Sequence, residues 1–155
     1  MQQLSPQTSS AVASFGRLLG AHAALTRELS AQLVQQHGLT MSELEVLVLL
    51  SRAPEQAMRR IDLSREVRLS PSGITRMLDR MEATGLVEKG PCKEDARVSY
   101  AVLTAAGAEK LREAWPDHRA SIERLLGERF SRSELATLTE LLDRVAEPVE
   151  CELGS

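Results

Sequence analysis

The sequence has few aromatic, glycine and proline residues. Of its 155 residues, only 3% are Phe, Trp or Tyr, and there are nine glycines and six prolines. Alanine and leucine are abundant instead, and this composition predicts a largely helical protein. The chain is long enough for one domain with a substantial core and rather short for two, so a single domain over residues 1–155 is expected.

Long apolar runs and metal-ligand patterns are also missing. No run approaches the roughly 18 to 20 uncharged apolar residues of a membrane span, and the first residues are not a basic segment followed by an apolar one. We therefore expect a cytoplasmic protein that does not bind membranes. Cys92 and Cys151 are too few for a disulfide framework and lack metal-ligand spacing. Each is expected to be a free reduced thiol, and no metal or cofactor is predicted.

Catalytic motifs are equally absent. The three histidines, His22, His37 and His118, are scattered along the chain. The sequence contains neither a glycine-rich phosphate loop nor a nucleophile elbow. An enzyme is therefore not expected.

The net charge of −3 argues against a protein that coats nucleic acid by bulk attraction. The distribution of charge is more informative. Residues 59–97 hold nine Lys or Arg and seven Asp or Glu, so this segment carries +2 and the rest of the chain −5. This excess alone is a weak indication of DNA binding, because a solvated helix face often shows as much.

Residues 70–85 predict an amphipathic helix with one face available to a partner. Ser70 can cap its first turn, Pro71 suits the first helical position, and Gly85 can end it in a left-handed conformation. Four apolar residues recur at helical spacing and should pack inward: Ile74, Met77, Leu78 and Met81. The opposite face is polar and cationic, with Ser72, Thr75, Arg76 and Asp79, and with Arg80 on its flank.

A shorter helix is expected directly before it, within residues 62–69, with Arg68 and Leu69 between its end and Ser70. Asp62 should cap this helix, with Leu63 and Val67 facing inward. Because only two residues separate its end from Ser70, the two helices must cross at a steep angle. This arrangement is a helix-turn-helix, in which the first helix supports the second against the major groove of DNA.

Residues 86–90 and 98–103 predict two strands joined by a charged segment, 91–97. Residues 58–61 are expected to add a third strand to this hairpin. A charged hairpin beside a recognition helix makes a winged helix-turn-helix. The expected fold class is therefore mainly α with a small β wing.

A long helix is expected at the start of the chain, over residues 11–37, with Gly38 as its stop. Its length exceeds what a small domain needs, so a partner outside the chain's own core is expected. After the wing, Thr104 can cap a further helix that runs to about residue 126. Pro116 lacks a backbone donor in the middle of that helix and should kink or interrupt it.

Two capping boxes mark further helix starts. In each box, a hydroxyl residue and the glutamate three positions later satisfy each other's backbone donors. Thr40 and Glu43 open an apolar run, residues 44–50, that predicts a buried helix. Ser131 and Glu134 open a last amphipathic helix.

Taken together, these segments resemble the multiple-antibiotic-resistance regulator (MarR) family of bacterial transcription factors over essentially the whole chain. Residues 69–87 resemble the family's recognition helix and the Gly-Leu-Val that follows it. Asp95 and Arg97 match its D-x-R wing signature, and Thr104 and Gly107 match the opening of the helix after the wing. The order and spacing of these pieces are more specific than any one of them.

The resemblance implies a homodimer that binds double-stranded DNA at a pseudo-palindromic operator, usually as a repressor released by a small-molecule effector or by oxidation. The winged helix-turn-helix lobe would then span residues 40–103. It would be flanked by N- and C-terminal dimerisation helices over residues 11–37 and 104–147.

The same match places Ser70, Ser72, Thr75 and Arg76 where the family touches bases and nearby phosphates in the major groove. Arg76 can offer a guanine two parallel donors, which a lysine cannot copy. Arg80, Lys89 and Lys93 are expected to meet phosphates, which adds affinity without choosing sequence. The predicted DNA-contacting set is Ser70, Pro71, Ser72, Thr75, Arg76, Arg80, Lys89, Lys93, Asp95 and Arg97.

On the wing, the resemblance places Arg97 where an arginine enters the minor groove and Asp95 where an acid orients that arginine. A guanidinium is favoured there because a narrow minor groove concentrates negative potential. Ala96 departs from the family pattern, in which a second arginine is frequent at this position.

Plainer interpretations stay open for several of these residues. Arg76 and Arg97 could be solvated surface arginines, and Asp95 a turn residue. Any of Arg80, Lys89 and Lys93 could likewise be only solvated. His22 is either a core or interface residue of the first helix or part of an effector-binding cavity. Cys92 could sense oxidation, since Lys93 beside it favours the thiolate. A rival to the regulator interpretation is a helical protein-interaction module that keeps the winged fold without reading DNA.

Overall fold

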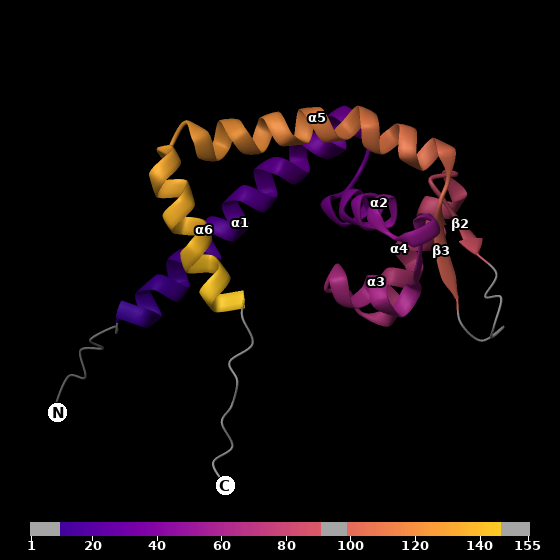
Figure 1. Cartoon of the computed structure of the whole chain (residues 1–155), viewed down its shortest axis with the longest axis horizontal. Coiled ribbons are helices and arrows are strands. Elements are labelled where there is room, and N and C mark those ends of the chain that lie inside the picture. Colours follow the sequence, from indigo (N-terminus) through magenta and orange to yellow (C-terminus); the bar gives the residue numbers. More distant parts are fainter. Residues whose placement is uncertain (1–9, 91–98, 147–155) are drawn as a thin grey trace, which may run out of the picture. The chain divides into compact units, whose positions relative to one another are not determined.

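The computed structural model describes residues 10–90 and 99–146, and within these ranges it is mainly helical (Figure 1). By contacts, the chain divides into two compact units, one ending at His118 and the other beginning at Arg119. Across the described residues, no helix combines the length and apolar character needed to span a membrane. The helices are α1 Ser10–His37, α2 Met41–Arg52, α3 Arg60–Glu66, α4 Pro71–Ala83, α5 Ala105–Gly127 and α6 Arg132–Ala146, with a short 3-10 turn at Pro54–Gln56.

Three short strands form one antiparallel sheet in the order β1-β3-β2. Their bounds are β1 Ala57–Arg59, β2 Val87–Gly90 and β3 Tyr100–Leu103. The third strand predicted from sequence is therefore confirmed, but it lies slightly earlier than residues 58–61. Ile61 belongs instead to the first turn of α3.

The core of the first unit lies where α2, α3 and α4 meet the sheet. Leu47 and Leu50 of α2, Leu63 of α3, and Leu78 and Met81 of α4 are at most 1% exposed. The whole predicted inner face of α4 is buried in this cluster. Because this apolar face of α4 is buried, the opposite face of the helix is exposed to solvent.

The predicted helix ends are confirmed at most positions. The Ser70 hydroxyl accepts a hydrogen bond from the Gly73 amide at the start of α4, and Pro71 occupies its first position. Gly38 and Gly85 adopt φ values of +67° and +76° after α1 and α4, a conformation that glycine takes without a steric penalty.

The expectation that Asp62 caps α3 is wrong. The helix begins two residues earlier, at Arg60, and Arg59 occupies the cap position without a side-chain cap. Asp62 lies in the first turn, where its charge interacts favourably with the helix dipole, and it pairs with Arg65 at 3.7 Å.

The expected interruption at Pro116 is also wrong, because α5 continues through this residue as one helix. Proline removes a single backbone hydrogen bond there. The helix is 23 residues long, and it buries Ala114 before the proline and His118 after it, so packing can offset the loss of one hydrogen bond. A bend at Pro116 stays a prediction.

Candidate nucleic-acid interface

The turn between α3 and α4 brings the two helices together as a helix-turn-helix. The helix α3 ends at Glu66, and Arg68 adopts a left-handed conformation with φ of +55°. This lets the Leu69 amide donate back to the Ser64 carbonyl at 2.9 Å, before Ser70 starts α4. The backbone thus reverses within a few residues although no glycine occupies the left-handed position.

The outer face of α4 is exposed, as the sequence predicted. Ser72, Thr75, Arg76 and Asp79 all lie on the surface. The Thr75 hydroxyl donates to the Pro71 carbonyl at 2.8 Å, which fixes its rotamer. Among the described residues, Arg76 has no hydrogen-bond or ion-pair partner. Its guanidinium is therefore the free donor group at the centre of this face.

Asp79 does not make this face acidic, because a neighbouring helix supplies the opposite charge. The Nη2 atom of Arg60, on α3, lies 3.9 Å from a carboxylate oxygen of Asp79. The Arg60 side chain is largely buried, and its Nε atom has no hydrogen-bond partner within residues 10–90 and 99–146. Because Asp79 is paired, Arg76 is the charge of the outer α4 face that no described residue matches.

Only the base of the wing lies within the described residues. Lys89 on β2 is exposed, and its Nζ atom lies 3.4 Å from the Glu82 carboxylate on α4. Lys93, Asp95 and Arg97, together with Cys92 and Ala96, lie outside the described residues. Their predicted contacts stay predictions.

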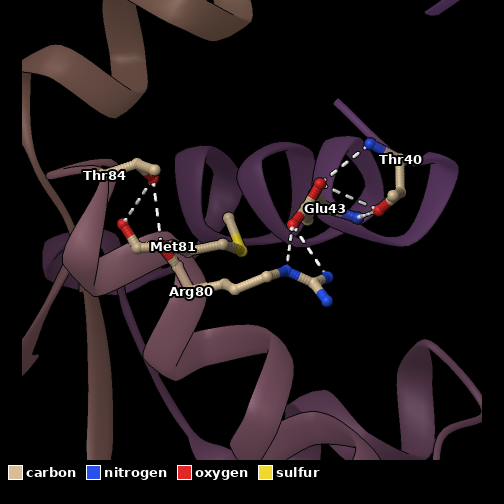
Figure 2. Close-up of polar contacts among 5 residues, drawn as sticks. All are labelled: Thr40, Glu43, Arg80, Met81 and Thr84. Atoms are coloured by element: carbon tan, nitrogen blue, oxygen red, sulfur yellow. Dashed lines mark hydrogen bonds and ion pairs between the residues drawn. The ribbon is translucent and has the colours of Figure 1, made fainter. Parts of the chain in front are cut away.

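Arg80 has a partner that sequence reasoning missed. Its Nε and Nη2 atoms donate to Oε1 of Glu43 at 3.3 and 3.0 Å, from the last turn of α4 to the first turn of α2 (Figure 2). Glu43 was predicted only as part of a capping box. Because the two residues are 37 positions apart, no local pattern signals their contact.

Two threonines, Thr84 and Thr104, form hydrogen bonds at the C-terminal end of α4. The Thr84 hydroxyl donates to the carbonyls of Arg80 and Met81, closing the last turn (Figure 2). The Thr104 hydroxyl donates to the Gly85 carbonyl at 2.6 Å and accepts from the Gly107 amide at 3.0 Å. Thr104 thus caps α5, as predicted, and also fastens the end of α4.

Gly107 is required by close packing at this point. A Cβ atom on residue 107 would overlap the Leu86 carbonyl and press on the Leu103 side chain. The start of α5 therefore lies directly against the backbone that leads from α4 into β2.

His22 is exposed on α1 in this chain. Its predicted part in an effector site stays a prediction. The buried histidine is His118, which is 8% exposed and whose ring lies 6.1 Å from that of Trp115, centre to centre. Burial lowers the pKa of His118, because desolvation disfavours the charged imidazolium.

A helix-turn-helix with a three-stranded wing and an exposed polar recognition face defines the winged-helix class of DNA-binding proteins. The model of the MarR family matches residues 39–99 of this chain. The HTH-type transcriptional regulator MhqR of Bacillus subtilis is 31% identical over 112 residues, covering 72% of this chain and 75% of MhqR. The chain therefore belongs to the MarR family of transcriptional regulators, which are not enzymes.

Solved structures agree with this assignment. The MarR family regulator AbsC of Streptomyces coelicolor superposes with a TM-score of 0.80 and 33% identity, covering 90% of this chain and 94% of AbsC. Sco3205 from the same organism, solved in complex with DNA, gives a TM-score of 0.83 and 25% identity, covering 95% of this chain and 94% of Sco3205.

Proposed function

We propose that this protein is a cytoplasmic, homodimeric repressor that binds a pseudo-palindromic operator and is released by a small molecule. The observation that carries the proposal is the outer face of α4, which is polar, exposed and centred on Arg76, a side chain with no partner in the part of the chain that the structure describes. Its opposite face is buried in the core, so this surface is presented rigidly. The DNA complex of the related Sco3205 supports the assignment of DNA as partner.

Base reading is assigned to the first two turns of α4. Arg76 suits the O6 and N7 acceptors of guanine, and Ser72 and Thr75 suit base edges, thymine methyl groups or phosphates. Ser70 and Pro71 lie at the start of the helix, where its backbone amides favour a phosphate. Lys89 on the wing base, and Lys93, Asp95 and Arg97 beyond it, are assigned to the flanking backbone and minor groove.

A homodimer is supported by apolar side chains that each terminal helix exposes. On α1, Phe15 and Leu19 are 61% and 53% exposed. On α6, Leu141 and Val145 are 49% and 73% exposed. Apolar surface of this kind marks a protein interface. Two copies joined through these helices would carry two copies of α4, and a two-fold symmetric dimer reads half-sites about 10 base pairs apart.

A small-molecule effector is supported by a cleft of about 380 Å³ between α2 and α5. Its wall is partly apolar, with Val48, Leu111 and Trp115, and it includes Arg52 and Arg112. Trp115 is the only tryptophan of the chain, so its fluorescence would report ligand entry directly. His22, on α1, does not line this cleft. Effector binding that is unchanged in His22→Ala would rule out its predicted part in an effector site.

The first experiment is selection of bound sequences from random duplex DNA with the purified protein. A two-fold symmetric site supports the proposal. Arg76→Ala should then weaken binding to the selected site by about 1 to 3 kcal/mol and relax one base position in each half-site. Arg124→Ala, an exposed arginine outside the winged lobe, is the matched control and should bind like the wild type.

The rival function is a helical protein-interaction module that keeps the winged fold without reading DNA. A gel shift with the protein's own upstream region, with and without competitor DNA, separates the two. Failure to select any duplex, or Arg76→Ala binding equal to wild type, would count against the regulator proposal.

A further inference from the structure

Glu43 combines burial, a negative charge and two sets of donors. The residue is 8% exposed. Its Oε2 atom accepts hydrogen bonds from the Thr40 amide at 2.8 Å and the Thr40 hydroxyl at 3.0 Å. The other oxygen accepts both donors of Arg80, as Figure 2 shows. The carboxylate is therefore fixed by α2 and presented to α4.

Arg80 lies next to the surface assigned to DNA. It follows Arg76 by four positions, so the two side chains are neighbours along α4. Its side chain is 64% exposed. From this position the guanidinium could bind a DNA phosphate, unless an interaction within the chain competes for it.

Electrostatic arguments favour Glu43 over a DNA phosphate as the partner of Arg80. A buried carboxylate that loses its cation keeps an uncompensated charge away from water, and this is strongly unfavourable. A DNA phosphate is exposed to solvent, and its attraction for a side chain is weakened by salt. Arg80 therefore remains paired within the chain when α4 approaches the duplex.

We propose that Glu43 is a positioning residue that withholds Arg80 from the DNA backbone and so limits the sequence-independent part of binding. The proposal rests on the proposed DNA-binding function. It replaces the sequence-based expectation that Arg80 meets a phosphate. That contact would form only when the Glu43 charge is removed.

The test is the salt dependence of binding by Glu43→Gln. Glutamine can keep the capping box at this position, so the start of α2 is preserved while the charge that holds Arg80 is lost. Each new phosphate contact steepens the slope of log affinity against log salt by about 0.9, or about 1.8 for a homodimer with two such arginines. Between 50 and 200 mM salt, the variant's affinity should then fall about twelvefold more than that of the wild type.

Three further variants make the test specific to the pair. Glu43→Ala removes the acceptor altogether and should steepen the slope in the same way. Arg80→Gln should keep the wild-type slope, and so should the double variant Glu43→Gln/Arg80→Gln. Glu134→Gln makes the same chemical change in the other capping box and should also leave the slope unchanged.

Affinity is measured for a random-sequence duplex and for the selected operator, and thermal melting shows that each variant is folded. A wild-type slope in folded Glu43→Gln overturns the proposal. Equal steepening in the double variant overturns it too, since bulk charge would then be the cause. A shallower slope in Arg80→Gln would mean that Arg80 already contacts DNA. If the wild type itself selects no duplex, the proposed function fails instead.

Discussion

The two capping boxes of the chain share one motif but differ in their surroundings. In both, the glutamate accepts a hydrogen bond at 2.8 Å from the backbone amide of the capping residue, Thr40 or Ser131. The return bonds, from the amide of Glu43 or Glu134 to the cap hydroxyl, are 3.2 and 3.4 Å. Locally, the two helix starts are nearly identical.

The two glutamates differ in burial and in their further hydrogen-bond partners. Glu43 is buried and its second oxygen binds Arg80 of another helix. Glu134 is exposed, and within the described residues it accepts hydrogen bonds only from Ser131. The motif itself therefore specifies where a helix begins. Tertiary packing decides whether the same carboxylate also joins two helices.

The largest effect on stability is expected from Arg80→Ala. It would leave half of a buried carboxylate without a donor, at a cost of about 2 kcal/mol in the free energy of unfolding. This is below the cost for a fully buried pair because the Arg80 side chain is 64% exposed. Urea denaturation measures the loss.

Arg119→Ala is the matched control for that measurement. Arg119 pairs with Glu123 at 2.8 Å on the same helix, and both side chains are exposed. A surface pair of this kind contributes little to stability. If the two arginine variants lost equal stability, the proposed difference between the buried and exposed carboxylates would be wrong.

A smaller effect is expected from removing the cap hydroxyls. Thr40→Ala should cost about 1 kcal/mol, because it removes the acceptor of the Glu43 amide and one of the donors to the buried Glu43 carboxylate. Ser131→Ala should cost less, because water can replace the lost hydrogen bonds there. Chemical denaturation followed by circular dichroism compares the two, and a larger loss for Ser131→Ala would contradict the ranking.

The smallest expected effect is on the pH dependence of folding stability, and it comes from the exposed capping box of Ser131 and Glu134. Hydrogen bonds from the Ser131 backbone, and then from its side chain, lower the pKa of Glu134. A carboxyl with a lowered pKa in the folded state stabilises the protein at pH values above its ordinary pKa, about 4.3. This contribution is lost as the pH falls through the lowered value.

Glu134→Gln should therefore show a slightly smaller loss of stability on acidification than the wild type. Unfolding free energies measured from neutral pH down to about pH 3 would reveal the difference, since this range includes the ordinary pKa of glutamate. Identical curves for the two proteins would show that the box hydrogen bonds do not favour the ionised form.

Local signals in the sequence were sufficient for most helix boundaries. Ser70, Thr40 and Ser131 cap where their side-chain chemistry predicts, and the buried stripe of α4 follows from spacing alone. Asp62 shows the limit of this approach. It is a good capping residue, but the strand β1 ends at Arg59 and the chain turns directly into α3 there.

Contacts between distant residues could not be predicted in the same way. The ion pair between Glu43 and Arg80 depends on how α2 and α4 pack, and no sequence pattern near either residue indicates it. The Arg60 pair that neutralises Asp79 likewise joins two helices. The exposure of Arg76 follows correctly from helical spacing, but its lack of a partner among the described residues emerged only from the positions of its neighbours.

The Thr104 hydroxyl joins the end of α4 to the start of α5. One oxygen atom links the Gly85 carbonyl, just beyond α4, to the Gly107 amide in the first turn of α5. The two segments are also in close contact here, because the Gly107 backbone lies against the Leu86 carbonyl. A displacement of the start of α5 would therefore act directly on the backbone at the end of α4, through one hydroxyl oxygen and one close backbone contact.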